Sequence, residues 1–249
     1  MKYKTGCLII HGFGATTSEV EPLSKYLKSK GFVTFCPSLK YSMENRKAFS
    51  NTSYSEWIQS AESSLKYLKS KCKDVVIIGF YMGGLIAANF AARFKIFSLI
   101  TINTPIYYWN IKNIYYNILI DCRTGNFNNV KRYMKTPIEF SISELINFRL
   151  LIKKTKPVFS KVKVPMFIGQ SLMDDAVQYR SAEYIYKKVS SNLKVLRCYD
   201  NLNRDLSNCS NSNLVFTDIE EFIKQVTKRE NGIDKRLLPS FKYLDGTYN

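Results

Sequence analysis

Two short segments have the residue types of a site for covalent catalysis. The first, Gly79 to Gly83 (GFYMG), follows the apolar run Val75 to Ile78 and opens a strongly apolar helical stretch. A G-x-S-x-G sequence in this context forms a tight strand-to-helix turn that exposes a nucleophile, and its small residues let strand and helix approach closely. The centre of the motif here is Tyr81 instead of serine. The sequence therefore predicts the turn, with Gly79 and Gly83 as structural residues, but without its usual nucleophile.

The second segment is the loop His11 to Gly14 (HGFG), which follows the apolar run Cys7 to Ile10. A loop in this place supplies a backbone N–H that helps to hold the oxyanion of an acyl-transfer intermediate. Each motif alone has little specificity. Together, in this order, they indicate a scaffold built for acyl transfer.

The elements that must position these segments alternate between short β-rich runs and amphipathic helical patterns. This alternation predicts an α/β fold with a mostly parallel sheet and helices on both faces. Helical spacing is clear from Tyr54 to Leu68 and from Val215 to Val226, and Ser18 followed by Glu21 has the spacing of a capping box. The predicted strands are Cys7 to Ile10, Phe32 to Phe35, Val75 to Ile78, Phe97 to Ile102, Pro165 to Ile168 and Leu193 to Arg197.

The alternation stops between about residues 106 and 163, where aromatic and helical patterns occur without strand signals. We interpret this stretch as a helical lid inserted into a core formed by residues 1–105 and 164–228, with a surface extension at 229–249. Two readings of the lid aromatics stay open: they line an apolar pocket, or they pack the lid onto the core. These aromatics are Tyr107, Tyr108, Trp109, Tyr115 and Tyr116.

The charge balance is strongly basic, with 37 Lys and Arg against 20 Asp and Glu and a formal net charge of +17. Such a charge attracts polyanions, either nucleic acid or an anionic membrane. The alternative is a coding bias towards Lys, Asn, Ile and Tyr that scatters lysines over helix surfaces. We find no basic block comparable to a nucleic-acid-binding arm.

No apolar run is long enough to span a membrane or to form a signal-peptide core, so we expect a cytoplasmic protein. The cysteines show no C-x-x-C spacing, and we expect free, buried thiols. No ligand set for a metal or an organic cofactor is recognisable, and none is predicted. The six cysteines are Cys7, Cys36, Cys72, Cys122, Cys198 and Cys209.

Over nearly its whole length the chain resembles the carboxylesterase and monoacylglycerol-lipase family of bacilli and their relatives. The resemblance is carried by GCLIIHGFGATTSEVEPLSKYLKSKGF, VVIIGFYMGGLIAANFA, KVKVPMFIGQ, DDAVQYRSAEYIYKKVSS and VFTDIEEFI. It implies the α/β-hydrolase fold and a helical lid over an acyl-binding pocket. The activity that it implies is hydrolysis of short- to medium-chain esters and monoacylglycerols.

Carried over to this chain, the catalytic serine of the family falls on Tyr81 and the aspartate on Asp174, with Asp175 as the alternative. The histidine of a Ser-Gly-His segment falls on Arg204, with Asn203 at the glycine. The resemblance places the oxyanion donors on the backbone amides of Phe13 and Met82.

His11 is the only histidine in the chain, and the resemblance assigns it the structural role of orienting the oxyanion loop. A Ser-His-Asp triad therefore cannot be assembled in the usual way. Arg204 cannot replace the histidine, because a guanidinium does not give up its proton at useful pH.

Two roles remain open for Tyr81. As a nucleophile it would need a phenolate, which a nearby Arg204 would favour. As a filler it would occupy the space of the substrate carbonyl and donate a hydrogen bond to Asp174, with Arg204 paired to the same carboxylate. In either case the turn must hold a bulky residue at positive φ or relax.

From the residues we predict a pseudo-hydrolase that binds an acyl or other apolar small molecule under the lid, or a protein partner. The first alternative is an active acyl hydrolase that uses Tyr81, Asp174 and Arg204. The second is a basic protein that binds polyanions.

Overall fold

A parallel six-stranded sheet forms the centre of the computed structural model, which describes residues 3–39, 52–108, 111–131, 141–200, 202 and 212–230. The strand order is β2-β1-β3-β4-β5-β6, and every neighbouring pair is parallel. Each strand predicted from the sequence is present, so the predicted fold class is confirmed. The strands are β1 (Tyr3–Ile10), β2 (Val33–Phe35), β3 (Cys72–Phe80), β4 (Ser98–Ile102), β5 (Met166–Ser171) and β6 (Lys194–Tyr199).

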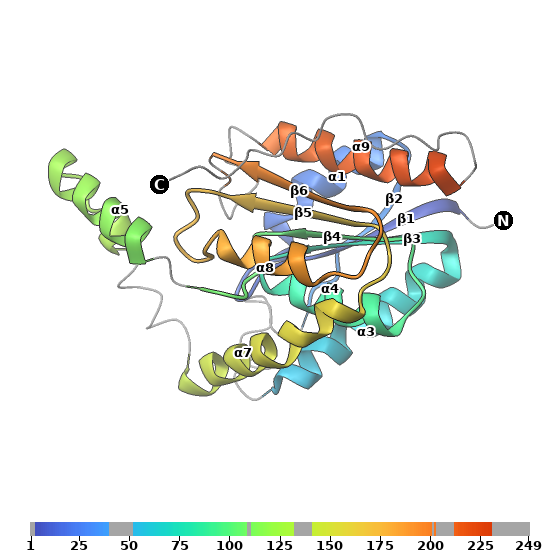
Figure 1. The fold of residues 1–249 in the computed structure, drawn as a ribbon, viewed down its shortest axis with the longest axis horizontal. Coiled ribbons are helices and arrows are strands. Elements are labelled where there is room, and N and C mark those ends of the chain that lie inside the picture. The colour runs from blue at the N-terminus through green and yellow to red at the C-terminus, as the bar shows by residue number, and fades with distance from the viewer. Residues whose placement is uncertain are drawn as a thin grey trace.

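Helices cover both faces of this sheet (Figure 1). One face carries α1 (Glu21–Ser29) and α9 (Ser212–Glu230), and the other carries α3 (Tyr54–Lys71), α4 (Met82–Arg93), α7 (Ile142–Thr155) and α8 (Arg180–Lys188). Because both faces are buried, the middle strands contain runs of consecutive apolar residues, such as Val75 to Ile78, instead of strict alternation. In β3, Val75 and Ile77 face one core, whereas Val76 and Ile78 face the other.

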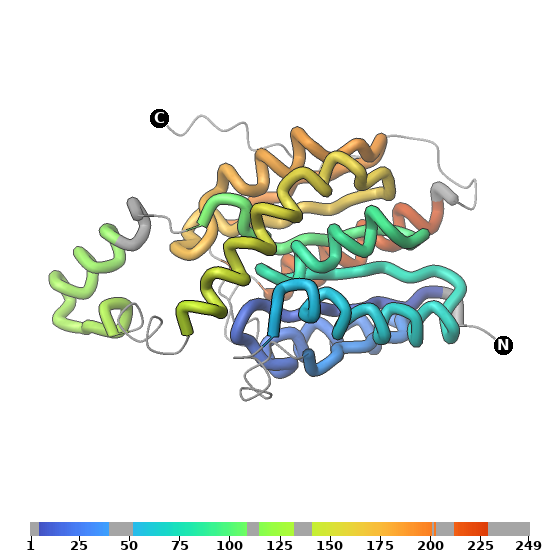
Figure 2. Tube along the Cα trace, turned by 90° about the horizontal axis from the view of Figure 1, so that it is seen from below, coloured from blue at the N-terminus to red at the C-terminus, as the bar shows by residue number. Residues whose placement is uncertain are grey.

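The connection from β4 to β5 is helical in the part that the structure describes. It contains α5 (Ile111–Thr124), α7 and the 3-10 helix η3 (Lys156–Lys161). Figures 1 and 2 both show α5 standing apart from the sheet, whereas α7 packs against α3 and α4. The predicted insertion is thus helical, but its role as a lid over a pocket stays a prediction.

Helix α7 starts at a capping box that the sequence analysis missed. The Ser141 hydroxyl accepts a hydrogen bond from the Glu144 backbone N–H, and the Glu144 carboxylate accepts one from the Ser141 N–H. The predicted box at Ser18 and Glu21 is wrong. Ser18 lies inside the 3-10 helix η1 (Thr17–Glu19), and α1 starts after Val20 without a side-chain cap.

Two further expectations need correction. Tyr115 and Tyr116 do not pack on the core, since their exposed fractions are 63% and 52%, whereas Tyr107 and Tyr108 do; that lid aromatics line a pocket stays a prediction. The described cysteines are all free thiols, but only Cys7 and Cys72 among them are buried; Cys36 and Cys198 are half-buried and Cys122 is exposed.

Two other predictions fall partly or wholly beyond what the structure describes. Trp109, Cys209 and residues 231–249 lie outside the described residues, and α9 continues to Glu230, past the predicted start of the extension. None of the described helices combines the length and the apolar character that a membrane span requires.

Candidate active site

The carboxyl ends of the central strands meet at one edge of the sheet, where open α/β sheets place their sites. His11 follows β1, Tyr81 follows β3 and Asn103 follows β4. The loop after β5 brings Asp174 to the same edge, where its carboxylate contacts Tyr81. Segments far apart in the sequence therefore converge on one small volume.

Tyr81 sits in the strained turn that the motif predicts. It precedes the first residue of α4 with φ 49° and ψ −117°, and the turn has not relaxed to accommodate the larger side chain. A positive φ at a bulky residue costs roughly 1–3 kcal/mol. Close packing on both sides fixes the turn: a Cβ on Gly79 would meet the Gly83 backbone, and one on Gly83 would meet the carbonyl oxygens of Ile10 and His11.

The Tyr81 side chain points at Asp174. Its hydroxyl donates a 2.6 Å hydrogen bond to Asp174 Oδ2, and both residues are buried, with exposed fractions of 8% and 7%. The hydrogen bond predicted from the sequence is confirmed. It is Asp174 and not the alternative Asp175 that accepts this bond.

Asn103 joins this pair and was missed by the sequence analysis. Its side-chain amide donates to the Tyr81 hydroxyl oxygen at 3.2 Å and to Asp174 Oδ2 at 3.1 Å, and its Oδ1 accepts from the Ser171 backbone N–H at 2.7 Å. Asn103 is fully buried and has φ 47°, a conformation that asparagine tolerates better than most residues. The available signal was the position of Asn103, an asparagine directly after the predicted strand that ends at Ile102.

The second oxygen of Asp174 is held by its own loop. Oδ1 accepts hydrogen bonds from the backbone N–H groups of Ala176 at 2.8 Å and Val177 at 2.7 Å. Burial raises the pKa of Asp174 to about 6, although the hydrogen bonds from Tyr81, Val177 and Ala176 pull it back down. The carboxylate therefore titrates just below neutral pH.

The predicted oxyanion loop lies beside the turn. A Cβ on Gly12 would stand 3.3 Å from Tyr81 Cβ, and His11 is buried with Nδ1 3.0 Å from the Gly12 carbonyl oxygen. The Phe13 ring stacks on Phe148 of α7, with centroids 4.8 Å apart. The inserted helix is thus anchored directly on this loop.

The remaining predicted positions have different outcomes. Met82 is buried as the first residue of α4, directly after the turn. Arg204 and Asn203 lie outside the described residues, so the predicted pairing of Arg204 with Asp174 stays a prediction. The described residues contain no cluster of three or more His, Cys, Asp or Glu side chains that could hold a metal ion.

Comparisons with known proteins agree with this geometry, although no family model matches the chain. It is 22% identical over 230 residues to the carboxylesterase of Bacillus subtilis (strain 168), covering 88% of this chain and 92% of the relative. It is 25% identical over 202 residues to a thermostable monoacylglycerol lipase of Bacillus sp. (strain H-257), covering 76% and 78%. A solved structure of the metagenome-derived lipolytic enzymes LipS and LipT superposes with a TM-score of 0.73 at 16% identity, covering 90% of this chain and 95% of that one.

The sheet order, the strained turn and these superpositions show the α/β-hydrolase fold. In sequence, the chain is related to a carboxylesterase and a monoacylglycerol lipase of bacilli, as the motifs indicated.

Proposed function

We propose that this chain is a pseudo-hydrolase, an α/β-hydrolase scaffold that binds an apolar or acyl molecule, or a protein partner, without hydrolysing esters by a Ser-His-Asp mechanism. The observation that carries the proposal is the 2.6 Å hydrogen bond from the Tyr81 hydroxyl to Asp174. In a triad, an imidazole stands between the nucleophile and the carboxylate and relays the proton. Here no imidazole stands between them, because the phenol ring of Tyr81 reaches from the turn to the Asp174 carboxylate.

The hydrogen bonds around Asp174 support the same conclusion. Its two oxygens accept from Tyr81, Asn103, Ala176 and Val177, so both are already engaged. A carboxylate held in this way stabilises the hydrogen-bonded contact with Tyr81 and Asn103 and does not orient a general base. The packing of Phe148 on Phe13 keeps the inserted helix close to the loop, as a binding role requires.

An active hydrolase with Tyr81 as nucleophile is the second candidate, and one observation favours it. The short bond to Asp174 offers a path for the phenol proton, because Asp174 is partly ionised near pH 6. The phenolate would attack the ester carbonyl, the alcohol would leave with a proton from solvent, and the acyl group would remain on Tyr81 as an aryl ester. Water must then cleave that ester to complete turnover.

Hydrolysis of a p-nitrophenyl ester series tests the proposal, with the wild type compared with Tyr81→Ser/Arg204→His. We expect no wild-type turnover above background and clear turnover by the double variant. A matched triple variant that adds Asp174→Asn should lose roughly 10⁴-fold of the restored rate, because the carboxylate fixes the histidine tautomer.

Mass spectrometry of the wild type after exposure to p-nitrophenyl acetate separates the two candidates. An acyl adduct on Tyr81 together with steady turnover would establish the active hydrolase and overturn the pseudo-hydrolase. An adduct without turnover, or no adduct, supports the pseudo-hydrolase.

A further inference from the structure

The outward face of α7 changes from apolar to basic along the helix. Ile142, Leu145, Ile146 and Leu150 are exposed, with fractions of 78% for Ile142 and 52% for Ile146. Arg149, Lys153 and Lys154 continue the same outward stripe at helical spacing, whereas the opposite side buries Glu144, Leu151, Ile152 and Thr155. We call the seven exposed residues the α7 stripe.

The charge beside the α7 stripe is not balanced by acids. From residue 141 to residue 163 the acidic residue is Glu144, which is buried and engaged in capping, whereas Lys161 and Lys163 add two exposed cations just beyond the helix. On the opposite face of the sheet, two lysines lie in ion pairs: Lys25 lies 3.1 Å from Glu21, and Lys30 lies 3.7 Å from Glu220. The segment from residue 141 to residue 163 therefore carries an excess of positive charge.

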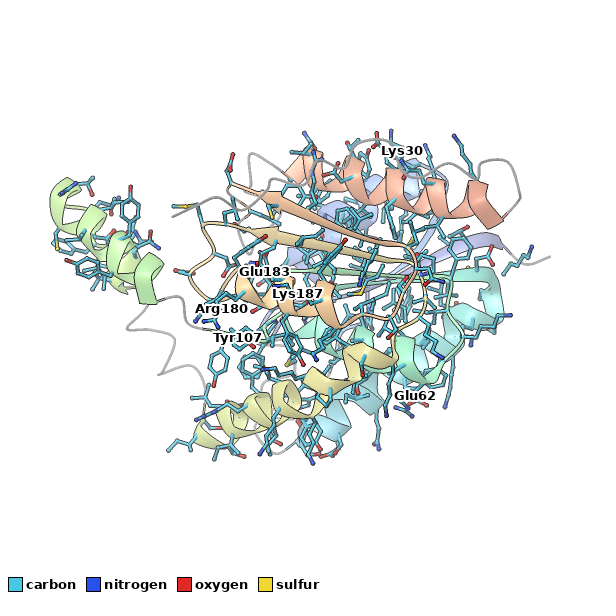
Figure 3. The ribbon with its side chains drawn as sticks, in the orientation of Figure 1. Lys30, Glu62, Tyr107, Arg180, Glu183 and Lys187 are labelled. Atoms are coloured by element: carbon cyan, nitrogen blue, oxygen red, sulfur yellow. The ribbon has the colours of Figure 1, made fainter. Side chains whose placement is uncertain are left out.

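Neighbouring structure extends both halves of the stripe. Helix α5 exposes Tyr115, Tyr116 and Ile120, and the apolar end of α7 points towards the end of the molecule where α5 lies (Figures 1 and 2). Beyond the C-terminal end of α7, η3 packs against α8, on which Lys187 is exposed, whereas Arg180 at the start of α8 lies over the Tyr107 ring, 5.2 Å from its centroid (Figure 3).

The base of this segment is held firmly to the core. Lys156 Nζ lies 4.4 Å from the ring centroid of Tyr107 and 4.7 Å from that of Tyr184, and it donates a 3.2 Å hydrogen bond to the Tyr107 hydroxyl. The α7 stripe is thus a fixed surface and not a loose appendage.

We infer that the α7 stripe docks onto an anionic lipid bilayer, with the helix lying in the plane of the interface. Exposed isoleucine and leucine beside cations are the composition that such helices use: the apolar side chains enter the boundary of the acyl chains, and the lysines contact lipid phosphates. A nucleic acid would match the lysines but leave the isoleucines in water. A second copy would bring two unbalanced basic surfaces together.

Co-sedimentation with vesicles tests this inference on the full chain, using phosphatidylcholine with and without phosphatidylserine. We expect binding to the phosphatidylserine vesicles that weakens as salt screens the charges. Lys153→Glu/Lys154→Glu and Ile142→Ser/Ile146→Ser should each lower that binding by about tenfold or more. Every changed side chain is exposed, so circular dichroism and thermal unfolding should match the wild type.

Matched controls change the same side-chain types on the opposite face: Lys28→Glu/Lys228→Glu on α1 and α9, and Leu214→Ser on α9. Unchanged vesicle binding by these controls supports docking through the α7 stripe. If Lys28→Glu/Lys228→Glu loses as much binding as Lys153→Glu/Lys154→Glu, the binding is a general charge effect and the inference fails. Equal binding to both vesicle types, no vesicle binding, or binding of single-stranded RNA alone with loss in the same variants would each overturn the inference. None of these outcomes depends on whether the Tyr81 site hydrolyses esters.

Discussion

The phenol oxygen of Tyr81 lies 2.6 Å from Asp174 Oδ2, so the residue at the centre of the strand-to-helix turn touches the carboxylate that follows β5. These residues are 93 positions apart in the chain, and the parallel sheet brings them together. The contact is buried and shared with Asn103, which makes it sensitive to protonation and to the loss of any one partner.

Asp174 should make the folded state less stable as the pH rises from about 4 to about 6. Its pKa is 3.8 ordinarily and about 6 in the folded chain, because burial disfavours the charge. In that interval the folded state binds more protons than the unfolded state, so stability falls with pH, by about 3 kcal/mol over the whole interval. Below about pH 4 the contribution is fully present.

Urea unfolding of wild type and Asp174→Asn across this pH range measures the effect. The amide can still accept a hydrogen bond from Tyr81 but does not titrate. The difference in the free energy of unfolding between the two proteins should therefore change with pH as predicted for Asp174. If the free energy of unfolding depends on pH in the same way in both proteins, the assignment to Asp174 is contradicted.

Asn103→Ala should destabilise the chain by roughly 2–4 kcal/mol. The substitution leaves the buried Ser171 N–H without its acceptor and takes a donor from both Tyr81 and Asp174. Asn103→Gly removes the same hydrogen bonds but relieves the positive φ, so it should cost about 1 kcal/mol less than alanine. Urea unfolding measures these losses. If both variants have the same midpoint urea concentration as the wild type, Asn103 does not stabilise this cluster.

Gly83→Ala should be among the most damaging single-methyl additions, at roughly 3 kcal/mol or more, since the new Cβ meets backbone carbonyls that cannot rotate away. Gly125→Ala is the matched control: it has φ 69° and open space around the new methyl, so it should cost only about 1–2 kcal/mol. Thermal unfolding of the two variants gives the comparison. Equal losses would mean that the close approach of α4 to β1 is easily relaxed.

The periodic features of this fold were predictable from the sequence, because a parallel strand buried on both faces is a short apolar run and its helices repeat at 3.6 residues. Val75 to Ile78 and the stretch after Tyr54 are examples. Asp174, which the sequence analysis reached by counting back from Ser181 and Ala182 in the following helix, is the carboxylate that contacts Tyr81.

Isolated contacts were not predictable in this way. Asn103 is a single polar residue whose partners come from two other strands, and no local spacing signals that meeting. Ser18 and Glu21 had the spacing of a capping box, but residues 17–19 turn as a 3-10 helix before α1 begins, so the spacing no longer matched the helix start. Ser141 and Glu144 share the same spacing and do form the box.

The positive φ at Tyr81 persists although no serine needs it. The close approach of Gly79 to Gly83, and of Gly83 to the carbonyl oxygens of Ile10 and His11, holds that backbone shape. The turn conformation therefore does not require a serine at position 81. A substitution at this position could add or remove a nucleophile while the strand-to-helix turn that presents it keeps its shape.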